Sequence, residues 1–192
     1  MNSVAQLFPA GHRLRLSLST SYWPLAWPPP SPARLTIFTG ASALILPVRE
    51  PRDEDTGLEF FETPAVAPPL DKTILKPSDR NWRVVRDLAL DESVLEVTKN
   101  EGTYRLDAID LEVTNWTQER YRSVDDDFGS VSGEVLSQRG LKRGDWEVRT
   151  VTRTILTSTP TDFQIQADLD AYEGNKRVFA KSWDKKVPRD LV

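Results

Sequence analysis

One serine and one histidine are the residues that could give this chain hydrolase chemistry. Residues 40–44 read Gly-Ala-Ser-Ala-Leu, which approaches the Gly-x-Ser-x-Gly nucleophile elbow. Leu44 stands where that strained turn requires its second glycine, and strand-like sequence lies on both sides of Ser42. His12 precedes another strand-like run, and its spacing pairs it with neither a nucleophile nor a carboxylate. We therefore expect a turn histidine bonded to the backbone and no catalytic residue, which makes an esterase using Ser42 and His12 the least favoured hypothesis.

Metal and cofactor sites are also not expected. The chain has no cysteine and a single histidine, which excludes disulfides, thiolate metal centres and paired-histidine zinc sites. The acidic cluster 125–127 fails as an EF-hand, because counting from Asp125 places Gly129 at the fifth position and Leu136 at the twelfth, where a glutamate is required. The cluster predicts a solvated loop at the end of a strand.

Aromatic residues surrounded by prolines form the most distinctive segment. Tyr22, Trp23 and Trp27 share residues 22–32 with five prolines, so the backbone there cannot supply a full strand ladder. Such a segment suits either a rigid loop packed on a neighbouring domain or a platform for a sugar or another apolar ligand. We favour the interface, because apolar residues of low conformational entropy are typical of one.

Composition limits the remaining classes. The 192 residues are 39% hydrophobic and 28% charged, as in ordinary globular proteins, and the net charge of −4 gives no reason to expect a nucleic-acid partner. No apolar run approaches the length of a membrane span, and the N-terminus lacks the pattern of a signal peptide, so we expect a soluble, cytoplasmic chain. Residues 176–192 hold six basic and two acidic residues, which is typical of lysines that protect an edge strand.

Alternation of apolar and polar residues predicts β-strands, and these strands would position the residues discussed above. The pattern is clearest over 162–173, and the turn sequence at 173–176 joins it to a further strand. The other expected strands are 12–20, 34–39, 42–48, 82–90, 94–98, 103–106, 109–122, 146–157 and 177–183. The chain is therefore predicted to be all-β, a sandwich or a strongly curled sheet. A proline-bearing crossing over 50–80 divides it into domains 1–80 and 81–192.

Residues 4–19, which read VAQLFPAGHRLRLSLS, resemble the C-terminal jelly-roll domain of X-Pro dipeptidyl-peptidases and of the cocaine esterase group of acyl esterases. Residues 21–28 fill the proline-bearing loop of that pattern, and 35–48 resemble the strand pair that follows. Residues 82–89 and 178–184 resemble the C-terminal extension of a longer subgroup. The resemblance implies a galactose-binding-like jelly-roll sandwich, partial here, followed by a long-stranded antiparallel meander packed on it.

The same resemblance implies a function without chemistry in this chain. The catalytic triad of these serine hydrolases lies in a separate α/β-hydrolase domain, and His12 matches the Gly-His-Arg of the jelly roll. We expect a non-catalytic region that supports the catalytic domain or its assembly. The alternative is a stand-alone module that binds a carbohydrate or another ligand. The jelly roll would need strands before Val4, so an N-terminally incomplete chain that is poorly stable or homo-oligomeric is expected.

Overall fold

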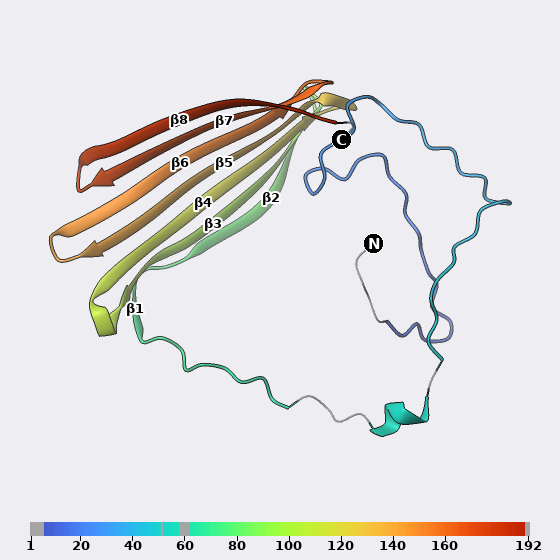
Figure 1. The fold of residues 1–192 in the computed structure, drawn as a ribbon, viewed down its shortest axis with the longest axis horizontal. Helices are drawn as coiled ribbons and strands as arrows, with labels where there is room; N and C mark the ends of the chain where they lie inside the picture. The colour runs from blue at the N-terminus through green and yellow to red at the C-terminus, as the bar shows by residue number, and fades with distance from the viewer. Residues whose placement is uncertain (1–5, 51, 58–61, 191–192) are drawn as a thin grey trace.

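A computed structural model describes residues 6–50, 52–57 and 62–190. Its organised part is one open antiparallel sheet with the strand order β1-β3-β4-β5-β6-β7-β8, in which β2 also pairs with β3 (Figure 1). The strands are β1 (Lys72–Lys76), β2 (Asp79–Asp87), β3 (Glu92–Leu106), β4 (Leu111–Val124), β5 (Asp127–Arg143), β6 (Trp146–Ser158), β7 (Asp162–Glu173) and β8 (Lys176–Pro188). A short 3-10 helix, η2 (Asp107–Ile109), joins β3 to β4. The predicted all-β class is confirmed.

The last three strands form the meander that the alternation predicts. In β7 the residues of one parity are more exposed than those of the other over most of its length, as expected for a strand with one drier face. The predicted turn at 173–176 joins β7 to β8, and Gly174 adopts a φ of 53°, a conformation that glycine takes without steric strain. Both strands thus follow from local sequence.

Two strands differ from the sequence-based expectation. β5 was not predicted, because three glycines interrupt its apolar pattern and weaken the strand signal. β1 lies inside the stretch 50–80, which was expected to be a proline-bearing crossing without a strand. The segments 94–98 and 103–106 are parts of one strand, β3, whose register shifts between Asn100 and Thr103. This bulge lets β1 and β2 share the same edge of β3.

The two faces of the sheet have different chemistry. On one face the register aligns apolar side chains across strands, as in Leu95 opposite Tyr121 and Leu156 opposite Ile165. The other face carries ion pairs, including Glu96 with both Arg83 (2.6 Å) and Arg120 (3.3 Å) and Glu134 with Arg153 (2.6 Å). The sheet is a single layer with no second sheet on either face, so within its described strands only Val94, Val97 and Val131 are buried hydrophobic side chains.

The first part of the chain does not form the strands that were predicted for it. Residues 12–20, 34–39 and 42–48 were expected to be strands, but no ladder forms there, and the described part of 6–71 holds only an isolated bridge and the 3-10 helix η1 (Asp53–Gly57). Figure 1 shows most of this segment as a long, extended loop outside the sheet, apart from the part that lies beside the end of β8. An alternating sequence becomes a strand only when a neighbour supplies hydrogen-bond partners for its backbone, and no described segment does so here.

Candidate functional site

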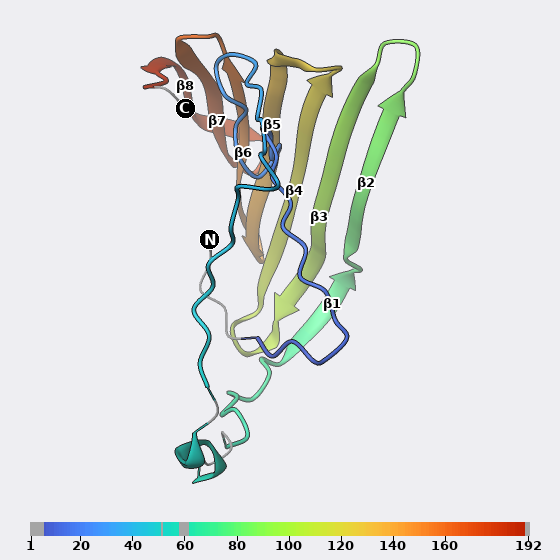
Figure 2. The same cartoon turned by 90° about the vertical axis from the view of Figure 1, so that its right-hand side faces the viewer.

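The proline-bearing loop 21–32 packs on one end of the sheet, close to the turns that join β4 to β5 and β6 to β7. Trp23 makes an edge contact with Tyr121 of β4 at 5.9 Å between ring centroids. Trp27 makes the same kind of contact with Phe163 of β7 at 5.5 Å, and the two indoles meet each other at 4.8 Å. Figures 1 and 2 both place this loop at the end of the sheet where β8 finishes. The sheet register therefore supplies the aromatic partners that position both tryptophans.

Hydrogen bonds anchor the loop at its C-terminal half. The indole nitrogen of Trp27 donates to Ser158 Oγ at 2.8 Å. Arg189, whose residue is only 3% exposed, donates to the carbonyl oxygens of Pro28 and Thr159. Its guanidinium also lies 4.9 Å from the ring centroid of Phe163. Burial lowers the pKa of Arg189 from its usual value. Pro28 is fully buried beneath these contacts, so the loop is fixed to the sheet.

The three predicted aromatic residues have different surroundings. Trp23 and Trp27 are half-buried against the sheet of their own chain, whereas Tyr22 is 68% exposed. The turn between them is closed by the amide of Ala26, which donates to the carbonyl of Tyr22 at 2.9 Å. The buried indole nitrogen of Trp23 has no hydrogen-bond partner in the described part of the chain. Contact with a ligand or another domain thus stays a prediction for these residues.

Ser42 and His12 form no catalytic arrangement in the described residues. Ser42 lies in a turn, and its hydroxyl donates to the carbonyl oxygen of Phe38 at 2.9 Å. The main-chain amide of His12 donates to the carbonyl of Pro9 at 3.1 Å, while its exposed imidazole makes no hydrogen bond there. A serine nucleophile needs a base within hydrogen-bond reach, and neither residue provides the other with that contact.

A polar cluster on the apolar face lies next to the docked loop. The ammonium group of Lys99 donates a hydrogen bond to the carboxylate of Glu119 at 2.7 Å, and the hydroxyl of Tyr121 donates to the same carboxylate at 2.9 Å. The hydrogen bond from Lys99 is the main cause that lowers the pKa of Glu119. Burial is the main cause that raises the pKa of Tyr121 to about 12, and its bond to Glu119 adds to this. Sequence reasoning missed this cluster, because only the register brings Lys99 opposite this part of β4.

The acidic cluster 125–127 lies in the turn between β4 and β5, which is the position predicted for it. The side chain of Asp127 accepts a hydrogen bond from the amide of Gly129 at 2.8 Å, so it closes its own turn. In the part of the chain that the structure describes, no group of three or more histidine or acidic side chains is arranged to hold a metal ion. No helix there has the length and apolar character that crossing a membrane requires.

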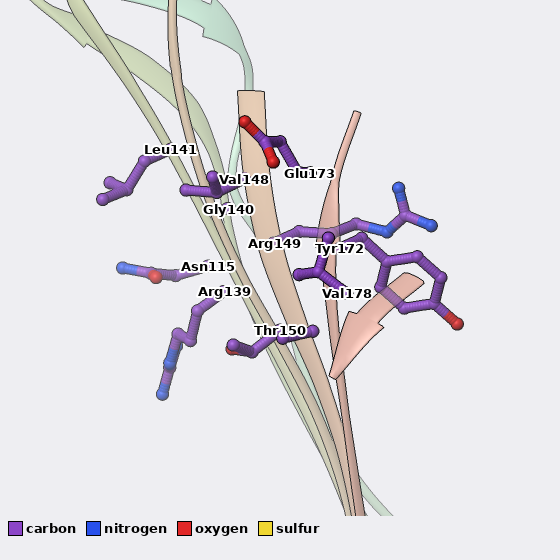
Figure 3. Close-up of a pocket in the computed structure, with 11 residues that line it drawn as sticks. Asn115, Arg139, Gly140, Leu141, Val148, Arg149, Thr150, Tyr172, Glu173 and Val178 are labelled. Atoms are coloured by element: carbon purple, nitrogen blue, oxygen red, sulfur yellow. The ribbon is translucent and has the colours of Figure 1, made fainter. Parts of the chain in front are cut away.

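An open hollow of about 560 Å³ lies at the other end of the sheet (Figure 3). Asn115, Arg139 and Thr150 line it together with apolar side chains of β5 and β6. Figure 3 shows Tyr172 and Arg149 on the opposite side of the β6 ribbon, where the guanidinium lies 4.0 Å from the Tyr172 ring centroid. These residues could contact a polar or charged molecule, but the hollow contains no nucleophile with an adjacent base.

Comparison with known proteins gives one family match. The model of the X-Pro dipeptidyl-peptidase C-terminal non-catalytic domain matches residues 1–58. This range contains the run 4–19, of which Val4 and Ala5 lie outside the described residues, together with the docked loop and residues 35–48. The resemblance of 82–89 and 178–184 to a longer subgroup lies beyond the match and stays a prediction. No curated protein and no solved structure matches the chain.

Proposed function

We propose that this chain is a non-catalytic C-terminal β region of a serine hydrolase of the X-Pro dipeptidyl-peptidase or acyl-esterase type. Its role is to support the catalytic domain or the assembly of that enzyme. The family match over residues 1–58 suggests the relationship. The docked loop 21–32 fits this role, because it links the matched segment firmly to the sheet formed by the remainder of the chain.

The observation that carries the proposal is a set of alternating apolar side chains without a covering partner. Leu14, Leu16 and Leu18 occupy every second position and are 55%, 57% and 57% exposed. Burying a leucine side chain is worth about 1.5–3 kcal/mol, so a strand with this pattern gains much from a second layer. The apolar face of the sheet also lacks a second layer. In our proposal, strands and surfaces of the hydrolase supply both.

Two-chain complementation tests the proposal. The α/β-hydrolase module of an X-Pro dipeptidyl-peptidase from the same source would be produced separately and mixed with this chain. We expect hydrolysis of Gly-Pro-p-nitroanilide to rise on mixing and the chain alone to give no turnover. Leu16→Asp should abolish the gain, because it places a charge in the apolar row. Ser17→Asp, at the adjacent position of opposite parity, serves as the control and should retain the gain.

Two results would contradict the proposal. One is the absence of binding between the two chains under conditions where each is folded. The other is ester hydrolysis by this chain alone that disappears on Ser42→Ala, which would restore the esterase hypothesis.

A stand-alone ligand-binding module is the less supported alternative. A sugar platform needs an aromatic ring whose face is open to the ligand. Trp23 and Trp27 instead make edge contacts with each other and with the sheet, and Trp27 uses its indole nitrogen on Ser158. Quenching of tryptophan fluorescence by a defined sugar, lost on Trp27→Ala in a chain that keeps its sheet, would favour this alternative.

A further inference from the structure

We infer that β2 is a self-pairing edge, through which two copies of this chain join their sheets in an antiparallel, two-fold arrangement centred on Val84. The inference concerns the outer edge of β2 and does not depend on the proposed function.

β2 has an open hydrogen-bonding edge along its whole length. Its nine residues pair with β3 in a continuous register from Asp79 opposite Asn100 to Asp87 opposite Glu92. All nine are exposed, and within the described residues β2 pairs with no other strand. Figure 2 shows β2 at the outer edge of the sheet. The amide and carbonyl groups that point away from β3 are therefore available to another strand.

The two edges of the sheet differ in their protection. β8 carries lysines at 176, 181, 185 and 186, its pairing with β7 shifts register between Ala171 and Tyr172, and it ends at Pro188. Lysines, bulges and prolines are the usual devices that prevent strand addition. β2 contains neither lysine nor proline, and its register with β3 is uninterrupted.

Apolar side chains on β2 provide contact area for a partner. Trp82 and Val84 project from the same face of the sheet and are 74% and 68% exposed, and Val85 on the other face is 47% exposed. Leu88 and Leu90, in the turn that follows, are 85% and 66% exposed. An added strand would cover these apolar groups and also pair with the free backbone of β2. Apolar burial and backbone hydrogen bonding therefore both favour association.

Charge selects the partner and the register. Pairing β2 with β8 of another copy would bring the three arginines of β2 against a strand rich in lysine, which is repulsive. Pairing β2 with β2 about Arg83 would oppose Arg83 to itself and Arg80 to Arg86. Shifting the centre to Val84 removes these like-charge pairs. It places Trp82 across from Arg86, a favourable cation–π arrangement, and Asn81 across from Asp87.

Cysteine cross-linking of the whole chain tests both the edge and the register, since the native sequence has no cysteine. Directly opposed residues of antiparallel strands have the Cα separation that a disulfide requires. Val84→Cys should therefore form a covalent dimer under mild oxidation. Trp82→Cys should not, because in this register the two cysteines are offset by several residues along the strands. Efficient cross-linking at position 82 instead of 84 would overturn the proposed arrangement.

Solution mass provides the second measurement. We expect the native chain to sediment as a dimer at micromolar concentration, and Val84→Lys to sediment as a monomer, because it places two like charges at the centre of the pairing. Val178→Lys, on the β8 edge at a site 52% exposed, is the matched control and should remain dimeric. Far-ultraviolet circular dichroism would establish that each variant keeps its sheet. A monomeric native chain, or a dimer unaffected by Val84→Lys, would refute the inference.

Discussion

Replacing Arg189 by methionine would test whether this side chain fastens the proline-bearing loop to the sheet. Methionine fills a similar space but donates no hydrogen bond, so the carbonyl oxygens of Pro28 and Thr159 would lose a charged donor. Hydrogen bonds to charged groups contribute about 1.5–3 kcal/mol, and each buried acceptor left unpaired costs about 1–3 kcal/mol. Methionine also removes the cost of burying a charged guanidinium, and this offsets part of the loss. We expect the docked loop to be destabilised by about 2–4 kcal/mol.

Hydrogen–deuterium exchange of the loop peptide measures this effect directly. The amide of Ala26 is hydrogen-bonded to Tyr22, so its exchange reports opening of the loop. A loss of 2–4 kcal/mol corresponds to a fall in the protection factor of about 30-fold to several hundred-fold. The measured fall cannot exceed the protection that the amide has in the native chain. Arg177→Met is the control, because Arg177 forms an exposed ion pair with Asp170 and such pairs contribute about 0–1 kcal/mol. Unchanged protection in Arg189→Met would show that the hydrogen bonds of Arg189 do not hold the loop.

Two further predictions concern the sheet itself. Gly102→Ala should lower the free energy of unfolding, measured in urea, by about 2 kcal/mol or more. Gly102 has a φ of 72°, and a Cβ there would collide with the carbonyl oxygens of Lys76 and Pro77. Gly140→Ala is the control and should change the free energy of unfolding little, because a Cβ at Gly140 would make only ordinary contacts. Acid should destabilise the native chain more than the Glu119→Gln variant, since the pKa of Glu119 is lowered on folding. The stabilisation from its charge is therefore complete above the unfolded-state pKa and is lost as the pH falls through the folded-state pKa. Urea unfolding at neutral pH and at successively lower pH measures the difference, and parallel acid losses in both proteins would contradict it.

The meander was predictable because its information is local. β7 has the bounds that its alternation indicates, and the glycine at 174 marks the turn to β8. β5 was not predicted because its glycines weaken the alternation of apolar and polar residues. Its long pairings with β4 and β6 position it in the sheet, and these are not visible in its own sequence. Ser42 was expected between two strands, but it lies in a turn, where its hydroxyl donates to the carbonyl oxygen of Phe38.

The sequence alone determined the all-β class, the strands of the C-terminal meander and the segment of the chain that resembles a hydrolase-associated domain. Period-two alternation and turn residues act over a few neighbouring positions, so one chain suffices to recognise them. Only the tertiary structure decided that loop 21–32 docks on the sheet through Arg189, that Glu119 meets Lys99, and that residues 12–20 remain unpaired. Each of these depends on which distant backbone lies alongside, and strand pairing is a property of two segments that neither sequence encodes by itself.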